Sequence, residues 1–552
     1  MRSREFVSPQ TNTKLRLPSL NQTSKIVFGV KSPSNLLTRQ EMERSFGYKP
    51  SARETSETTN NLKMPVGITK RVKINWSRNL IRPASKLPHI KDDNKQHDIS
   101  LSSPLSQMLL KWDKPNTKKY RCFIGPGNTE AVTRVLEDRG CWHFVDNMTD
   151  PKLNLIWKQT IAGINFNDYS SQKANLQPVF NHFEHHAEIS QKDSLLRNMA
   201  RYCDINGMNV FDFLPPSFEL RTDYRNLSVS LEGVTALFDV LTNGVMSGTD
   251  IDLNEHIHDL VSKCKIKLSE VNRKLDSLFS NTCRVKYIPA TMNKGQNMWM
   301  IKPIDFNRGN GIEMLSTALA LPRILKTVDG QIKTSHGKAR GRLLMQKYIE
   351  DPLLIDNRKF DIRMWVLLDC HLNLYIFPEG YLRLSSEDFS IYDTGKLIHL
   401  TNNAVQAHGA NYGKFEHGNQ ISFTDFRRLL KTDESYSYIE WNTKVYPQMF
   451  RQIKIAFNST INKLNSNRRE RNFELFGIDF MIDTAGGVWL IEVNTNPCIE
   501  LASPLLEGLI PRMLDDAFEL TVDTMCPPLN TKKRCYPVAG YPSDSNMWVR
   551  IN

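Results

Sequence analysis

The sequence predicts a mixed α/β fold, α+β in detail, and three observations support it. Residues 120–145 have the strand, turn, helix and strand pattern of a β-α-β unit. Residues 298–377 contain four β-rich runs, and residues 473–494 have the two β-rich segments and Gly-containing turn of a hairpin. Apolar residues recur at helical spacing over 445–464 and 504–525, so we expect helices beside these strands.

Length and composition predict several domains behind a polar N-terminal tail. The chain has 552 residues, 40% of them hydrophobic, which is enough for two or three domains with a large core. The first hundred residues are rich in Ser, Thr, Asn, Pro and basic residues without periodicity, which is typical of disorder. We expect a disordered basic tail over 1–103, an N-terminal α/β domain over 104–232, a helical insert or linker over 233–297, central and C-terminal domains over 298–525, and a C-terminal extension over 526–552.

The basic character of the chain belongs mostly to the tail. The net charge is +13, and residues 1–100 contribute +11 of it through 19 Lys and Arg against 8 Asp and Glu. Such a tail would attract an acidic surface such as nucleic acid, a membrane or a microtubule. The alternative is a solvated disordered arm without a partner.

The composition argues against membrane and secreted classes. No apolar run reaches the ~18 residues that a membrane span needs, and the first residues lead into polar sequence without an apolar signal-peptide core. The nine cysteines are scattered and form no CxxC pair, which predicts reduced thiols in the cytoplasm. His182, His185 and His186 lie close together, but no further Cys or His stands at a ligand spacing, so we expect structural histidines.

The hairpin at 473–494 carries the strongest functional signal. A loop centred on Ala485 and Gly486 places Asp479 opposite Glu492, with Asn494 on the same face as Glu492. Opposed carboxylates roughly 5 Å apart repel each other unless a cation lies between them. Hard oxygen ligands suit Mg²⁺, which proteins hold with one or two carboxylates plus substrate phosphates. The hairpin therefore predicts a site for a metal-bound nucleotide.

Basic residues on the earlier strands predict phosphate contacts. Lys302 ends one predicted strand, and the turn 308–311 that follows could cradle phosphate oxygens with its N–H groups, or could be an ordinary hairpin loop. Lys359, Asp361 and Arg363 occupy alternate positions of another strand. The functional interpretation places them in a site, and the alternative is the solvent face of an edge strand.

Five motifs in one order resemble the tubulin–tyrosine ligase-like family. They are Lys-Pro…Arg-Gly-x-Gly-Ile, Gln-Lys-Tyr-Ile-x-x-Pro-Leu-Leu, Arg-Lys-Phe-Asp-Ile-Arg, His-Leu-Thr-Asn and Phe-Gly-x-Asp-Phe…Trp-Leu-Ile-Glu-Val-Asn, and they span about 298 to 500. A weaker likeness extends back to about 118. The resemblance implies an ATP-grasp fold and a ligase that joins an amino acid to a tubulin carboxylate.

The resemblance also implies a role for each matching residue, with ATP and Mg²⁺ as cofactors. Lys302 and Arg363 would face phosphates, and Arg383 would bind the carboxylate of the incoming amino acid, so these three are the implied catalytic residues. The implied nucleotide contacts are Lys302, Arg308, Gly309, Gly311, Ile312, Gln346, Lys347, Tyr348, Ile349, Lys359, Asp361, Thr401 and Asn402. The implied metal ligands are Asp479, Glu492 and Asn494.

The implied reaction leaves the amino acid open. ATP would phosphorylate a carboxylate, and the amine of a free amino acid would attack the acyl-phosphate to form an amide. Asn403 and Ala404 replace a Tyr-Ser pair of the family's glutamate ligases, and no lysine follows Pro497 until Lys532. We therefore favour glycine or tyrosine over glutamate.

The expected partners are tubulin or microtubules, through their acidic tails, and a free amino acid. We expect no nucleic acid partner, a monomer, and a location in the cytoplasm and cytoskeleton, including a cilium or basal body. Two alternatives remain, a catalytically silent microtubule-binding protein with this fold and a ligase for a non-tubulin acidic protein. The presence of Lys302, Arg383 and all three metal ligands favours the ligase.

Overall fold

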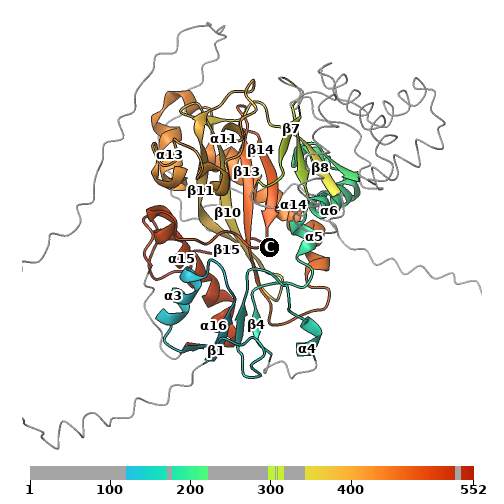
Figure 1. The fold of residues 1–552 in the computed structure, drawn as a ribbon, viewed down its shortest axis with the longest axis vertical. Coiled ribbons are helices and arrows are strands. Elements are labelled where there is room, and N and C mark those ends of the chain that lie inside the picture. Colours follow the sequence, from blue (N-terminus) through green and yellow to red (C-terminus); the bar gives the residue numbers. More distant parts are fainter. Residues whose placement is uncertain are drawn as a thin grey trace, which may run out of the picture. The chain divides into compact units, whose positions relative to one another are not determined.

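A computed structural model describes residues 120–170, 177–221, 296, 298–304, 306, 309–315, 342–528 and 536–552. All of them belong to one compact unit, Leu101–Asn552. They form three β-sheets with helices packed around them (Figure 1), so the predicted mixed α/β class is confirmed. The predicted tail, nearly all of the predicted insert over 233–297, and Arg308 lie outside the described residues.

The first sheet is parallel and contains the β-α-β unit expected from the sequence. Its strand order is β2-β1-β3-β4. The strands are β1 (Tyr120–Ile124), β2 (Trp142–Phe144), β3 (Leu155–Trp157) and β4 (Val179–Phe180). Helix α3 (Glu130–Asp138) connects β1 to β2 and buries its apolar side, because Val132, Val135 and Leu136 share one face. The helices that follow are α4 (Phe166–Ser170), α5 (Ala187–Ser190) and α6 (Lys192–Ile205).

The second sheet is antiparallel and supplies one wall of the site. Its order is β5-β8-β6-β7. The strands are β5 (Ser217–Arg221), β6 (Trp299–Pro303), β7 (Glu313–Leu315) and β8 (Arg342–Lys347), and a 3-10 turn, η2 (Val210–Asp212), precedes them. All five residues of β6 are buried, including Lys302. A buried lysine in a sheet needs polar partners, and that requirement leads to the site described below.

The central sheet supplies the opposite wall. Its order is β12-β11-β10-β13-β14, and β9 and β15 add to β10 and β11. The strands are β9 (Leu354–Ile355), β10 (Arg358–Leu368), β11 (Leu374–Asp388), β12 (Gln420–Ser422), β13 (Glu474–Ile482), β14 (Val488–Asn494) and β15 (Val549–Arg550). Figure 1 shows β10, β11, β13 and β14 side by side. Since β10 has partners on both sides, the edge-strand alternative for Lys359, Asp361 and Arg363 is wrong.

Strand β11 is longer than the sequence indicates. The expected strand ended at Phe377, which left Arg383 after it, whereas β11 continues through Arg383 to Asp388. The strand passes very close to β10 at Gly380, where a Cβ atom would lie 2.3 Å from the carbonyl oxygen of Arg363. Only glycine permits this approach. The continuation places Arg383 directly opposite Asp361.

The two faces of the central sheet belong to two hydrophobic cores. Ile362, Met364 and Val366 of β10 pack in one core with helices α6 and α14 (Tyr446–Leu464), whereas Trp365 and Leu367 pack in the other with α3 and α15 (Pro504–Leu520). The remaining α-helices of the described residues are α11 (Lys396–His399), α12 (Asn403–Gln406), α13 (Phe423–Thr432) and α16 (Val522–Met525). The 3-10 turns η6 (His417–Asn419) and η7 (Glu434–Tyr436) and the π-helical turn η8 (Trp441–Val445) also occur. Among the helices of the described ranges, none combines the length and the apolar character that crossing a bilayer requires.

Candidate active site

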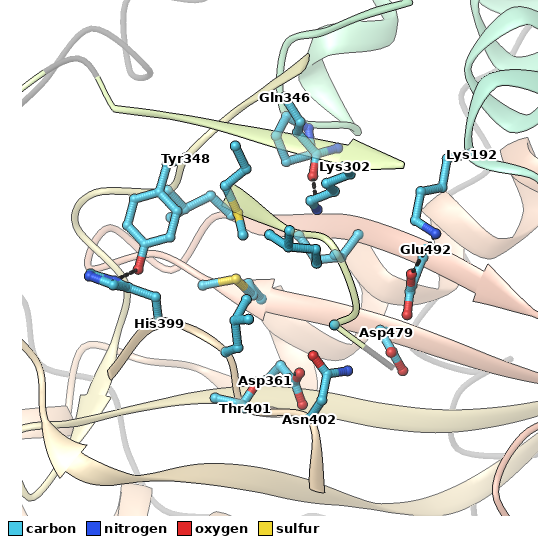
Figure 2. Close-up of a pocket in the computed structure, with 18 of the residues that line it drawn as sticks. Lys192, Lys302, Gln346, Tyr348, Asp361, His399, Thr401, Asn402, Asp479 and Glu492 are labelled. Carbon is cyan, nitrogen blue, oxygen red and sulfur yellow. Dashed lines mark hydrogen bonds and ion pairs between the residues drawn. The ribbon is translucent and has the colours of Figure 1, made fainter. Parts of the chain in front are cut away.

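A cleft lies between the second sheet and the central sheet (Figure 2). It encloses about 780 Å³ of space, part of which is open to solvent. The predicted site residues in its wall are Lys302, Gly309, Ile312, Gln346, Lys347, Tyr348, Ile349, Lys359, Asp361, Thr401, Asn402, Asp479 and Glu492. Segments that are distant in sequence therefore meet around one space.

Four predicted residues lie outside this wall. Gly311 follows the lining residues Gly309 and Asn310 with a φ of 68°, which is the left-handed region that glycine favours. Arg363, Arg383 and Asn494 pair with the carboxylates of the cleft and do not line it themselves.

The hairpin register is as predicted at the carboxylates and different at the turn. Asp479 pairs with Glu492 across β13 and β14. Nearer the turn, Ile482 pairs with Val488, so the loop is centred on Ala485 alone and the predicted pairing there is one residue wrong. A bulge at Ile491 absorbs the difference between the two registers and places that side chain in the wall of the cleft.

Four charged side chains form a network across β11, β10 and β13. Asp361 lies opposite Arg383, and Arg363 lies opposite Asp479. Arg363 Nε donates to Asp479 Oδ1 at 2.6 Å, while Arg383 donates to Asp361 Oδ1 at 2.6 Å and to Asp479 Oδ2 at 2.8 Å. The two arginines therefore offset the negative charge of Asp479. The sequence predicted only a bound cation for that purpose.

The network sets the protonation state of Asp479. Burial alone would raise the pKa of this carboxyl, but the guanidinium groups of Arg363 and Arg383 outweigh burial and hold the pKa well below its usual range. Asp479 is therefore ionised at any physiological pH. An ionised, buried carboxylate is what cation binding requires.

Two buried lysines face the carboxylates. Burial lowers the pKa of Lys302 to about 8, against the opposing effect of Glu492, and Gln346 accepts a hydrogen bond from the ammonium. Burial lowers the pKa of Lys359 to about 7, against the opposing effect of Asp361. Both ammonium groups are costly to bury without an anion, so this end of the cleft favours an anionic ligand.

The ammonium of Lys347 and the backbone N–H groups of Lys347 and Tyr348 are already hydrogen-bonded within the protein, although the resemblance implies that this segment contacts the nucleotide. The ammonium of Lys347 is held by Glu350 and by the carbonyl oxygen of Met298 at 3.2 Å. The backbone N–H of Lys347 donates to Pro216 at 2.7 Å, and that of Tyr348 donates to Met298 at 3.0 Å. Contacts between this segment and a base would therefore use other atoms.

Lys192 belongs to the site and was missed from the sequence. It begins helix α6 and lines the cleft, with its Nζ 3.9 Å from Glu492 Oε2 and 3.0 Å from the carbonyl oxygen of Phe306 (Figure 2). Its position lies outside the five motifs, and no local pattern marks it. His399 also lines the cleft, although the sequence indicated only the Thr401–Asn402 pair of its motif.

Of the three predicted metal ligands, the two carboxylates suit Mg²⁺ as they stand and the amide of Asn494 does not. Asp479 and Glu492 present carboxylates side by side, and Asn494 Nδ2 lies 3.2 Å from Glu492 Oε1. The amide of Asn494 must turn for its oxygen to serve as a ligand. Within the described residues no cluster of three or more His, Cys, Asp or Glu could hold a metal. A metal here would use two carboxylates and oxygens of its substrate, as Mg²⁺ usually does.

Fold and site together define a mixed α/β protein with a cleft whose wall brings lysines and carboxylates together. The chain belongs to the tubulin-tyrosine ligase family, because the sequence profile of that family matches residues 170–534. The resemblance seen in the five motifs is thereby confirmed.

The chain is similar to several glycylases. Tubulin glycylase 3B of Tetrahymena thermophila is 31% identical over 545 residues, which cover 77% of this chain and 44% of the relative. Tubulin glycylase 3D of the same organism is 34% identical over 247 residues, which cover 44% of this chain and 22% of the relative. Protein monoglycylase TTLL8 of Homo sapiens is 32% identical over 238 residues, which cover 42% of this chain and 27% of the relative. The chain spans less than half the length of these relatives.

Proposed function

We propose that the chain is an ATP- and Mg²⁺-dependent ligase that forms an amide bond between a free amino acid and a carboxylate of a tubulin tail. The observation that carries the proposal is the meeting of Lys302 and Lys359 with Asp479 and Glu492 across one cleft. Cations for phosphates and carboxylates for a metal are the two things that phosphoryl transfer requires of a protein. The chain's membership of the tubulin-tyrosine ligase family supports the acceptor.

The two antiparallel sheets would act as the two halves of an ATP-grasp fold. The base would lie toward Tyr348, Leu400 and Met481, which give the wall of the cleft apolar surface. The phosphates would lie toward Lys302 and Lys359. Lys192, from the N-terminal part of the chain, would approach the phosphates from the side of Glu492.

The reaction would have two steps. The terminal phosphoryl group of ATP moves to a carboxylate oxygen of the acceptor, and ADP leaves. The amine nitrogen of the amino acid then attacks the acyl carbon, the C–O bond to the phosphate breaks, and the amine gives up a proton. Lys302, Lys359 and Lys192 would neutralise charge on the transferred group, and no side-chain nucleophile is needed. Mg²⁺, held by Asp479 and Glu492 with Asn494, would supply further neutralisation of phosphate charge.

Arg383 would bind the carboxylate of the incoming amino acid. In the structure this guanidinium is committed to Asp361 and Asp479. Binding an amino acid there would require Arg383 to exchange one of these partners. A guanidinium has five N–H donors, so Arg383 could bind a new carboxylate in place of one of the two that it now holds.

Glycine is the amino acid that we favour, with tyrosine second and glutamate third. The three relatives above, which match 42% to 77% of this chain, are named as glycylases, which supports glycine. The absence of the Tyr-Ser pair at 403–404 agrees with this order. A tubulin substrate would place the protein in the cytoplasm and on the cytoskeleton, including cilia.

An incorporation assay tests the proposal. The full chain is incubated with tubulin, ATP, Mg²⁺ and one labelled amino acid at a time, namely glycine, tyrosine or glutamate. We expect label from glycine on tubulin, and no label when ATP is omitted or when the tubulin lacks its C-terminal tails. Labelling of tail-less tubulin would move the proposal to another acidic acceptor. Tubulin binding without incorporation of any amino acid would favour a catalytically silent microtubule-binding protein.

A further inference from the structure

A line of three hydrogen bonds runs from Lys359 in the wall of the cleft to Asp393, and Figure 2 shows the middle one, between Tyr348 and His399. Lys359 Nζ donates to Tyr348 Oη at 3.0 Å, and Tyr348 Oη lies 2.8 Å from His399 Nδ1. On its other side, His399 Nε2 contacts the carbonyl oxygen of Asp393. All three side chains are buried.

The direction of each hydrogen bond follows from the chemistry of its partners. A carbonyl oxygen only accepts, so the Nε2 atom of His399 carries the proton. Burial lowers the pKa of His399, the contact with Asp393 opposes this, and the nearby ammonium of Lys359 lowers it again, so the net shift favours the neutral ring. The Nδ1 atom of a neutral ring with a proton on Nε2 accepts. The hydroxyl of Tyr348 therefore donates to His399 and presents only lone pairs to Lys359.

Lys359 is held so that one donor remains for a ligand. Its ammonium donates to Tyr348 Oη and, at 2.8 Å, to the carbonyl oxygen of His399. It also lies 4.4 Å from the centroid of the Tyr348 ring, which favours the charged form. A lysine has three N–H donors, and Lys359 lines the cleft, so the third can serve a ligand bound there.

We propose that His399 and Tyr348 are positioning residues for Lys359. His399 fixes the hydroxyl of Tyr348 as an acceptor, and that acceptor favours the charged form of Lys359 and aims its ammonium at the phosphates of the nucleotide. The inference rests on the proposed function for the identity of the ligand, but the state of Lys359 can be measured without any ligand.

The physical reason is that a hydroxyl without its acceptor can turn. If His399 loses its Nδ1 atom, the hydroxyl proton of Tyr348 can turn toward Lys359. A neutral amine can accept this hydrogen bond, whereas an ammonium cannot. The neutral form of Lys359 would then gain a hydrogen bond. The charged groups that face this lysine are Asp361, which raises its pKa, and Lys302, which lowers it, on top of the dominant effect of burial.

The first test measures Lys359 in the nucleotide-free full chain. The rate of its acetylation by acetic anhydride is followed against pH by peptide mass spectrometry. We expect His399→Leu to lower the pKa of Lys359 by about one unit. His399→Asn keeps an acceptor where Nδ1 stood and should restore the wild-type profile, whereas His399→Gln, with its amide one bond further out, should not. Equal profiles for the wild type, His399→Asn and His399→Gln would overturn the proposal, even if His399→Leu does not fold.

The second test asks whether His399 acts through Tyr348. The affinity for a non-hydrolysable ATP analogue is measured for Tyr348→Phe, His399→Leu and the double variant. Each single variant should bind about tenfold more weakly, and the double variant no more weakly than Tyr348→Phe alone. If His399→Leu weakens nucleotide binding equally in the wild type and in Tyr348→Phe, His399 contacts the nucleotide directly and the positioning role is wrong. If the wild type binds no ATP analogue, the proposed function fails, while the acetylation profiles still decide this inference.

Discussion

Arg383 Nη2 lies 2.8 Å from Asp479 Oδ2, so an arginine on β11 reaches a carboxylate on β13 across the intervening strand β10. The other oxygen of Asp479 accepts from Arg363 at 2.6 Å. A metal ion bound by Asp479 must therefore share that carboxylate with arginines. The same contacts keep Asp479 charged and oriented toward Glu492 before any ligand arrives.

Replacing Arg383 should make the stability of the protein depend on Mg²⁺. Arg383→Ala leaves Asp361 and Asp479 without a shared cation, and losing one partner of a buried ion pair costs about 3 kcal/mol. A divalent cation can replace part of the lost charge. Urea unfolding with and without MgCl₂ should show a larger stabilisation by Mg²⁺ in the variant than in the wild type.

Arg428→Ala is the matched control for that experiment. Arg428 pairs with Asp425 on the exposed side of α13, where an ion pair contributes about 0.5 kcal/mol. Its unfolding should respond to Mg²⁺ as the wild type does. Equal stabilisation of Arg383→Ala and the wild type would contradict the view that arginine and metal serve the same carboxylates.

Glu492→Gln should abolish amino-acid incorporation and leave the fold intact. The substitution keeps the size of a residue that is partly exposed to the cleft but removes the charge that would bind a metal. The rate of label incorporation should fall by at least about a hundredfold, while the thermal unfolding midpoint stays close to that of the wild type. Glu507→Gln, on the exposed face of α15, should keep full activity. Full activity in Glu492→Gln would refute the metal assignment.

Nucleotide affinity should fall as the pH rises above about 7. The pKa of Lys359 is about 7 because the side chain is buried, so the ammonium is charged below that pH and neutral above it. A bound anion favours the charged form, so binding above pH 7 takes up a proton and weakens by up to about tenfold per pH unit. Titration calorimetry in buffers of different ionisation enthalpy measures this uptake. Lys359→Met should remove the step near pH 7, and an unchanged step would assign it to another group.

Arg512 should be essential for holding the C-terminal segment against helix α15. Arg512 and Asp516 are both completely buried and lie 2.9 Å apart, and Arg512 also donates to the carbonyl oxygens of Tyr536 and Pro542 at 3.1 Å. Arg512→Leu leaves the buried Asp516 carboxylate without its cation, although Met547 N–H still donates to it, and should lower the free energy of unfolding by about 3 kcal/mol.

Denaturant unfolding measures this loss, and Lys444→Ala serves for comparison. Lys444 forms an exposed pair with Glu440, so its replacement should change the stability by no more than about 0.5 kcal/mol. A loss from Arg512→Leu as small as that of Lys444→Ala would show that the segment 536–552 is held by its apolar contacts alone.

The sequence by itself determined several of the strands, helices α3, α14 and α15, and the pairing of Asp479 with Glu492. The alternation of side chains and the turn between β13 and β14 were enough to place Asp479 opposite Glu492, because hairpin pairing is a local property. The predicted apolar stripe of α14 is likewise buried at Met449, Ile453 and Phe457. The bulge at Ile491 was not foreseen, since the spacing of residues does not show where an extra residue enters a strand.

Only the tertiary structure decided which strands are neighbours. Local sequence does not show that β10 lies between β11 and β13, so the pairing of Arg383 with Asp361 and Asp479 could not be predicted. The same holds for Lys192, which reaches Glu492 from a helix outside every motif. Contacts between distant segments depend on how whole elements pack, and packing is set by the sum of many weak apolar contacts that no short pattern records.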